Sequence, residues 1–322
     1  MLDFLKQNDY KLHILSGGYI QEPATIEGVK WETTRVGEPS TLTFTVIKDD
    51  KLSFSEGAEV TFRYKDVGVF SGYVFEKRRN KDHHIQVTCF DRTRYLRNKA
   101  NYVMSGVRAD QVVMRIAQDR GLRVGKLTNT GYVIPKLAAQ DSTMFDVIQD
   151  ALDQTMMATG ELYCLYDDFG SLTLKHMKEM ITDLLITNDT AEDFDYTTSL
   201  EGNTANQIVV TGNDGNTTVV NDKKSQKQWG VLQYTANNQG GGNSEAMAKT
   251  MLSMYNQVTR SLSIKGAFGD IRVRGGSSVF VHLNLGDHIC KQSMLVSRAT
   301  HTFDNAHHSM ELTLIDGRGF YA

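Results

Sequence analysis

The stretch TLTFTV at residues 41–46 alternates hydroxyl-bearing side chains with large apolar ones. A period of two residues is typical of a β-strand with one face in a hydrophobic core and the other in water. The same alternation returns in VTFRY at residues 60–64. Turns rich in glycine, asparagine and aspartate separate such stretches between Tyr10 and Lys99. Several short strands joined by tight turns predict a barrel or a sandwich.

The pattern changes to a helical one after Ser105. Apolar residues between Val107 and Ala117 share one helical face, and Gly121 supplies a stop. A second helix is predicted to begin near Thr143, because Thr143 and Asp146 have the spacing of a capping box. A hairpin is expected to follow over residues 162–174, with its turn at DDFG. These elements indicate a small α+β module.

Strand patterns return in the last part of the chain, at residues 207–210, 278–283 and 310–315. One helix interrupts them, with Ser244 as its expected N-cap and a methionine-rich stripe that we expect to pack against a sheet. The residues from Gly212 to Asn243 are mostly polar. We therefore expect a long irregular arm there, suited to docking a partner.

Length and pattern together predict the domain organisation. A chain of 322 residues exceeds what one hydrophobic core usually organises. We expect a mainly β fold with an α+β insert. The predicted domains are a first β-domain at 1–104, the α+β module at 105–180, and a second β-domain at 181–322 that carries one helix and the polar arm 212–243.

Composition narrows the function. The formal net charge of -3 provides no overall attraction to nucleic acid or to anionic lipid. No apolar run is long enough to cross a bilayer, and the first residues lack the features of a signal peptide, so we expect a protein that is cytoplasmic when made and no membrane insertion. Cys89, Cys164 and Cys290 lie far apart without a CxxC pair, and we expect buried thiols rather than disulfides or a zinc site.

The sequence contains none of the stronger catalytic or phosphate-binding motifs. The nearest approach to a phosphate loop is GGGNS at residues 240–244, before the last helix. It lacks the lysine that a phosphate loop needs, so a hinge followed by a helix cap is the expected role. We predict no catalytic residue and no cofactor.

Histidines and paired acids offer weaker signals. Five of the nine histidines occur late in the chain, but they show no ligand spacing, and we predict no metal site. These are His282, His288, His301, His307 and His308. Three acid pairs could serve a glycosidase, but we interpret them as solvated turn residues. They are Asp49-Asp50, Asp167-Asp168 and Glu192-Asp193.

A basic cluster runs from Lys77 to Lys99 and is interleaved with Phe75, Phe90 and Tyr95. Such a cluster is one feature of a nucleic-acid surface. Asp82 and Asp91 dilute it, and we favour a solvated barrel edge. The same charges could also face an acidic partner or line a channel. Its basic members are Lys77, Arg78, Arg79, Lys81, Arg92, Arg94, Arg97 and Lys99.

Several segments together resemble a known family, the XkdQ-type baseplate hub proteins of contractile phage tails and phage-tail-like bacteriocins. The resemblance runs through almost the whole chain and depends on the order and spacing of the segments. In the first domain they are VKW at 29–31, LTF at 42–44, VFSGYV at 69–74 and CFDRTRYL at 89–96. In the last domain they are NQIVV at 206–210, Ser225 with WG at 229–230, GDIRVRGG at 269–276, HTF at 301–303 and HSMEL at 308–312.

The resemblance implies two tail-tube-like β-barrel domains and a homotrimer around a central channel. Such hubs join the tail tube protein to a spike protein and contact the tape-measure protein and baseplate wedge proteins. The family also looks similar to the late control protein D group and the T-even phage hub. The implied role is structural and the implied location is the tail baseplate of a virion or tail-like particle.

The resemblance leads to an architectural expectation. The segments at 25–99 and 181–315 should form two similar barrels, so that three chains supply six units to a hexameric tube. If the two segments instead paired into one continuous sheet sandwich, or packed face to face with no shared topology, the hub assignment would lose its structural basis. A tail-associated cell-wall glycan hydrolase and a nucleic-acid binder are the rival functions.

Overall fold

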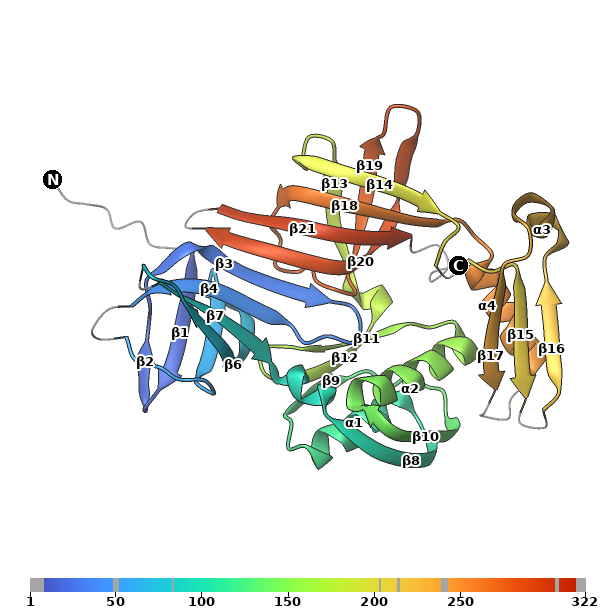
Figure 1. Ribbon diagram of the computed structural model, residues 1–322, viewed down its shortest axis with the longest axis horizontal. Coiled ribbons are helices and arrows are strands. Elements are labelled where there is room, and N and C mark those ends of the chain that lie inside the picture. The colour runs from blue at the N-terminus through green and yellow to red at the C-terminus, as the bar shows by residue number, and fades with distance from the viewer. Residues whose placement is uncertain are drawn as a thin grey trace.

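The computed structural model describes residues 9–48, 52–82, 84–202, 204–212, 215–238, 243–304 and 307–316. Strands predominate (Figure 1), so the prediction of a mainly β fold is confirmed. Within those ranges, no helix combines the length and the apolar character that a membrane span requires.

The N-terminal strands form a first β-unit: β1 (Tyr10–Ser16), β2 (Tyr19–Gln21), β3 (Thr25–Thr34), β4 (Thr41–Ile47), β5 (Glu59–Tyr64), β6 (Val67–Arg79) and β7 (His84–Asp91). They lie in the order β3-β4-β7-β6-β5-β1-β2, with every neighbouring pair antiparallel. Leu42, Phe44 and Val46 of β4 are buried in its core, as the alternation at residues 41–46 predicts.

The C-terminal strands form a second β-unit: β13 (Ile181–Thr187), β14 (Asp193–Ser199), β18 (Thr259–Phe268), β19 (Ser278–Asn284), β20 (Ile289–Asp304) and β21 (His307–Asp316). Their order is β14-β18-β21-β20-β19-β13. The core of this unit is aliphatic, with Leu262, Ile264 and Leu312 among its buried residues.

The two β-units repeat one strand order. If β1 and β3 to β7 are counted from one to six, and the six strands of the second unit likewise, both sheets read 2-3-6-5-4-1. The fifth strand carries a register shift at the same place in each unit, between Val74 and Glu76 in β6 and between Val296 and Arg298 in β20. One pair differs, because β1 pairs antiparallel with β5 whereas β13 pairs parallel with β19.

No closed barrel occurs within the described residues, so the barrel form expected for the two β-domains is not confirmed. Strand β3 pairs antiparallel with β20, Val29–Thr34 against Arg298–Phe303, and merges both units into one sheet of 13 strands. Within the described residues this sheet does not close on itself. The physical reason is the length of β20, which continues beyond Leu295, where its pairing with β19 ends, and so offers a free edge to β3. The shared strand order nevertheless fits the expected duplication.

The α+β module lies between the β-units along the chain. Its elements are the 3-10 turn η1 (Arg92–Arg97), β8 (Lys99–Val107), α1 (Ala109–Asp119), β9 (Val124–Leu127), β10 (Ile134–Thr143), α2 (Met144–Thr159), β11 (Tyr163–Asp167), β12 (Leu172–His176) and η2 (Met177–Met180). The Thr143 hydroxyl accepts from the backbone N–H of Asp146, and Gly160 ends α2 in the left-handed region. Both predicted helices and the predicted hairpin are confirmed.

The expected irregular arm is instead part of a small folded unit. Its elements are β15 (Gln207–Gly212), β16 (Thr217–Asn221), α3 (Lys223–Trp229), β17 (Gln233–Asn238) and α4 (Ser244–Tyr255). Strand β15 lies between β16 and β17, outside the second β-unit (Figure 1). Ala248 and Met251 of α4 are buried with Ile208 and Val210, so the methionine stripe packs on a sheet as predicted. The N-cap is Asn243 rather than Ser244, and residues 240–242 of the predicted hinge lie outside the described residues.

Candidate functional site: the junction and the open strand edges

The late histidines form a stacked pair. His301 is fully buried, its Nδ1 lies 2.9 Å from Nε2 of His308, and its Nε2 lies 2.8 Å from the Val273 carbonyl oxygen. Burial lowers the pKa of His301 to about 3 and that of His308 to about 4, so both rings are neutral at pH 7. His301 therefore donates to Val273 through Nε2 and accepts from His308 through Nδ1. The other late histidines are exposed, and the described residues include no cluster of three or more metal-ligating side chains.

The acid pairs that were expected to be solvated differ in their exposure. Asp49-Asp50 lies outside the described residues, and Glu192-Asp193 is exposed at the start of β14, as expected for solvated acids. The interpretation of Asp167 as a solvated turn residue is wrong, because its side chain is buried. It faces a junction of three parts of the chain that its own turn sequence does not reveal.

Asp167 lies near a second buried acid, Asp91 at the end of β7. The Asp91 carboxylate accepts from the backbone N–H groups of Ser40 and Thr93, at 3.1 and 2.9 Å. Burial, reinforced by the negative charge of Asp167, raises the pKa of Asp91 to about 7. Burial also raises the pKa of Asp167, while Gly170 N–H and Arg92 oppose that shift. The junction therefore carries a carboxyl group that changes protonation near neutral pH.

Arg274, which belongs to the second β-unit, contacts both the α+β module and the first β-unit at the junction. Its guanidinium carbon lies 3.8 Å from the ring centre of Tyr166 in the α+β module and 5.7 Å from that of Trp31 in β3. Its Nη2 donates to the Asp167 backbone carbonyl at 3.4 Å. A planar cation between two aromatic faces holds the second β-unit against both other parts.

Two glycines, Gly275 and Gly276, let the backbone after Arg274 lie close to β3 and β11. A Cβ added at Gly275 would lie 2.2 Å from the backbone carbonyl carbon of Thr34, and one added at Gly276 would lie 2.6 Å from the Cys164 sulfur. Gly276 also has a φ of +93°, which other residues rarely adopt. The Gly275 N–H donates to the Thr33 hydroxyl at 2.9 Å. Backbone, rather than side chain, thus contacts β3 and β11 here.

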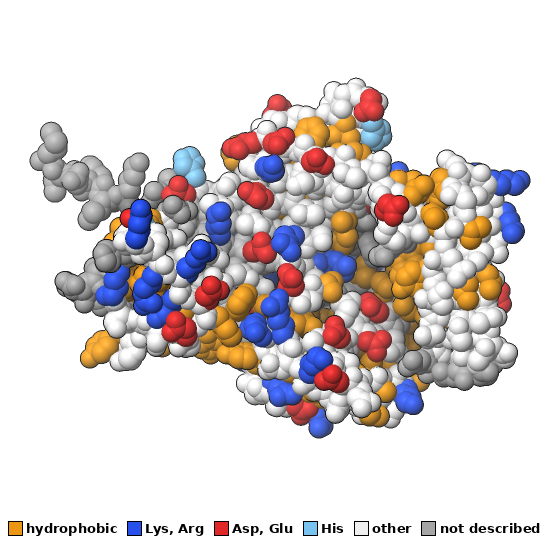
Figure 2. All heavy atoms as spheres, in the orientation of Figure 1, with side chains coloured by type: hydrophobic (Ala, Val, Ile, Leu, Met, Phe, Trp, Pro, Cys, Tyr) orange, Lys and Arg blue, Asp and Glu red, His pale blue; other side chains and the backbone are white. Residues whose placement is uncertain are grey.

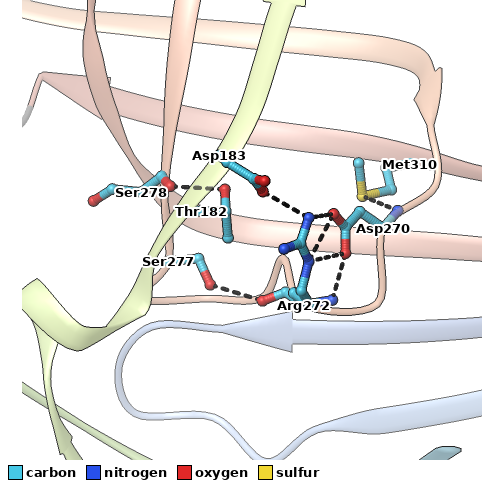
Figure 3. A network of polar contacts seen from close by, with 7 residues as sticks. All are labelled: Thr182, Asp183, Asp270, Arg272, Ser277, Ser278 and Met310. Atoms are coloured by element: carbon cyan, nitrogen blue, oxygen red, sulfur yellow. Dashed lines mark hydrogen bonds and ion pairs between the residues drawn. The ribbon is translucent and has the colours of Figure 1, made fainter.

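The same loop carries an ion network at its exposed side (Figure 3). Arg272 forms a fork with Asp270 and reaches Asp183 of β13 at 2.7 Å. The Ser277 hydroxyl donates to the Arg272 carbonyl oxygen at 3.3 Å, and the Thr182 hydroxyl donates to that of Ser278. These contacts fasten the loop to the second β-unit.

The segments that carry the family resemblance converge at this junction. Trp31, Asp91, Arg274 and His301 come from four of them, and Trp31 packs against His301 with ring centres 4.8 Å apart. Sequence reasoning did not assign a role to RVRGG at 272–276. The glycine pair after alternating arginines was the available signal, since consecutive glycines mark close backbone approach.

The basic cluster is divided among several places. Arg92 is held by Ser71 and Glu59 beside the junction, and Lys77 is largely covered, 3.5 Å from Glu56. Arg78 and Arg79 are exposed at the end of β6, and neither forms an ion pair with a described residue. Figure 2 shows lysines and arginines gathered over the first β-unit, whereas acids are more frequent over the second.

The sheet has open edges. Among the described strands, β14 pairs only with β18, and β13 pairs only with β19. Leu185 of β13 lies opposite Phe280 of β19, and the two side chains are 45% and 41% exposed. Tyr19 and Ile20 of β2 are also exposed. Unpaired strand edges and exposed apolar residues are typical of surfaces that associate with other chains.

A cleft of about 1040 Å³ separates α2 from the small unit. Asp150 and Asp153 of α2 lie on one side, and Tyr234 and Met247 on the other. Each carboxylate accepts a hydrogen bond from a glutamine on its own helix. Burial raises the pKa of both carboxyl groups, and these hydrogen bonds oppose that shift.

Solved structures share this fold. The 43 kDa tail protein of prophage MuSo2 from Shewanella oneidensis has a TM-score of 0.71 over 96% of this chain and 99% of that chain, at 12% identity. The E. coli c3393 protein, a type VI secretion system component, has a TM-score of 0.57 over 95% of this chain and 76% of that chain, at 11% identity. At these identities the likeness concerns the fold, which defines the class: a mainly β protein with a phage-tail protein fold.

Sequence comparison identifies the family within that class. The YQBQ-like family model matches residues 29–315, so the chain belongs to the YQBQ-like family. The phage-like element PBSX protein XkdQ of Bacillus subtilis (strain 168) is 29% identical over 308 residues, covering 92% of this chain and 93% of that protein. The resemblance to XkdQ-type proteins is therefore confirmed, and the chain is a structural protein of the phage-tail and baseplate type.

Proposed function

We propose that the chain is a baseplate hub, three copies of which form a ring that joins a tail tube to a central spike. The repeat of strand order 2-3-6-5-4-1 carries this proposal. Three chains with two alike units offer six similar surfaces to a hexameric tube and three to a trimeric spike. The MuSo2 protein is named a tail protein, and the c3393 protein is described as similar to T4 tail proteins gp27 and gp5, which supports the assignment.

The proposed division of the chain follows this role. Residues 1–104 and 181–322 supply the two ring units, and 105–180 braces them through the Arg274 junction. The small unit, which contains most of residues 212–243, projects at one end of the molecule (Figure 1). That position suits contacts with baseplate wedge proteins, whereas the tape-measure protein, tube and spike would meet the ring itself. The assembled location is the baseplate of a virion or tail-like particle.

We propose a structural rather than a catalytic role. The MuSo2 protein is named a tail protein and the c3393 protein a type VI secretion system component, and each cleft carboxylate accepts a hydrogen bond from a glutamine of its own helix. A zymogram on purified peptidoglycan tests this proposal. Clearing that disappears on substitution of Asp150 or Asp153 would favour the glycan hydrolase instead.

Sedimentation velocity tests the ring. The full chain should sediment as a trimer, either alone or with the tube and spike proteins of its own particle, since a partner can drive assembly. A chain that stays monomeric at high concentration and also with both partners present would contradict the hub assignment.

A further inference from the structure

Where strand pairings are shared, the repeat gives a residue of one β-unit a counterpart in the other. Tyr73 of β6 pairs with Phe90, and Leu295 of β20 pairs with Ile315. When the pairing is followed along each strand past its register shift, Glu76–Arg79 of β6 correspond to Arg298–His301 of β20. Matching the pairings of β4 with those of β18 in the same way makes β14 the counterpart of β3, and Tyr196 the counterpart of Trp31.

In β20 the counterpart segment is a strand-pairing edge. Arg298–Phe303 lies beyond the reach of β19 and pairs with β3. In β6 the segment Glu76–Arg79 likewise lies beyond the reach of β5, whose pairing ends at Tyr73. Strand β14, the counterpart of β3, is an end of the sheet. The β3–β20 pairing, called the internal joint below, therefore has an unused equivalent among the described strands. Its two edges would be the end of β6 and strand β14.

The two unused edges have opposite charge. Arg78 and Arg79 are exposed at the end of β6, whereas Asp193 and Asp195 are exposed on β14. In the internal joint, Arg298 reaches Glu32, its diagonal neighbour, at 3.4 Å. By the same mapping, the counterparts of Arg298 and Glu32 are Glu76 and Thr197, so the second joint would not repeat that ion pair at the same place. Its own diagonal neighbours of opposite charge would be Arg78 and Asp195.

A comparison of side-chain burial on β3 and β14 also supports a strand added beside β14. Val29 and Trp31 of β3 are 0% and 2% exposed beside β20. Their counterparts on β14, Phe194 and Tyr196, remain partly exposed. A strand added beside β14 would cover them as β20 covers β3, and aromatic burial would contribute to association.

We propose that β6 of one copy pairs antiparallel with β14 of the next copy, with Arg78 opposite Thr197 and Arg79 opposite Tyr196. This inference rests on the proposed ring and specifies the contact that closes it. A second copy is the occupant because one chain carries both halves of the contact, as a head-to-tail ring requires. The internal β3–β20 joint supplies the geometry.

Disulfide trapping tests the register. Directly opposed residues of an antiparallel pair have Cβ atoms roughly 4.5–5.5 Å apart, close to disulfide geometry. Arg78→Cys combined with Thr197→Cys should form dimers and trimers on mild oxidation. Arg78→Cys combined with Asp193→Cys is the control, since Asp193 lies about 13 Å further along the strand. The native Cys89, Cys164 and Cys290 are buried, so cross-links report the new pair.

The outcomes separate the strand pairing from the ring itself. Cross-linking of the Thr197 variant at least fivefold above the Asp193 control supports the pairing. Equal or absent cross-linking in samples that sediment as trimers overturns the pairing and leaves the hub proposal standing. Neither trimers nor cross-links, with tube and spike proteins present, overturns both.

Charge reversal provides a second measurement on a chain with native cysteines. Arg78→Glu with Arg79→Glu should raise the concentration for half-assembly roughly tenfold. Asp193→Lys with Asp195→Lys should do the same, and the fourfold variant should recover most of the loss. Circular dichroism of each variant checks folding. Two reversals that weaken assembly without mutual rescue would contradict the pairing.

Discussion

A substitution at Phe303 should show how much the internal β3–β20 joint contributes to the free energy of unfolding. Phe303 belongs to β20 of the second unit, but it is fully buried in the core of the first. Its ring centre lies 4.9 Å from that of Phe62, 5.1 Å from Tyr64 and 4.2 Å from His308. Phe303→Ala should lower the free energy of unfolding by about 3–5 kcal/mol, the usual cost of emptying an aromatic core site. Phe268→Ala, at a side chain 72% exposed, should change it by less than about 0.5 kcal/mol.

Tryptophan fluorescence reports on this joint directly. The chain has 2 tryptophans, and Trp31 packs against His301 in the joint. A Trp229→Phe background leaves Trp31 as the reporter during urea unfolding. Hydrogen exchange of residues 29–34 and 298–303 should also accelerate in the Phe303→Ala variant. Equal effects of Phe303→Ala and Phe268→Ala, or exchange that accelerates in the small unit instead, would refute the role assigned to the joint.

Three further predictions concern the junction. The raised pKa of Asp91 means that the folded state binds its proton more tightly than the unfolded state, whose pKa is near 3.8. This stabilisation is complete below 3.8 and is lost as the pH rises through about 7. Relative to Asp91→Asn, the wild type should therefore gain about 1.4 kcal/mol in urea unfolding between pH 8 and pH 6, and a pH-independent difference would contradict it. Gly275→Ala should lower the thermal midpoint through its clash with Thr34, at a cost of about 1–3 kcal/mol; an unchanged midpoint would argue against close backbone approach. Elemental analysis should find no stoichiometric zinc or iron, whereas one metal per chain would contradict the neutral histidine pair.

The parts that sequence predicts are those encoded over a few residues. Alternation at 41–46 predicts β4, and the Thr143 to Asp146 spacing predicts the start of α2, because both depend on local periodicity or capping. The burial of Asp167 was missed, since its environment comes from Arg274 and Asp91, far away in sequence. The small unit was missed for a related reason. Its strands β16 and β17 are largely polar, and their few apolar residues form a core only with α4.

The proposed joint between copies differs in chemistry from the observed β3–β20 joint, and the difference follows from when each would form. The internal joint forms as the chain folds, so its side of β20 can present His301 and Phe303, which are fully buried at once. A strand edge that waits for another copy is exposed to water until assembly, and apolar residues there would invite unspecific pairing. At the position equivalent to His301, β6 carries Arg79, with Arg78 exposed beside it, whereas Lys77 is largely covered. Charge keeps that edge soluble, and the acids of β14 make it selective for its own counterpart. On this argument, the basic segment at the end of β6 marks the edge that assembles between chains.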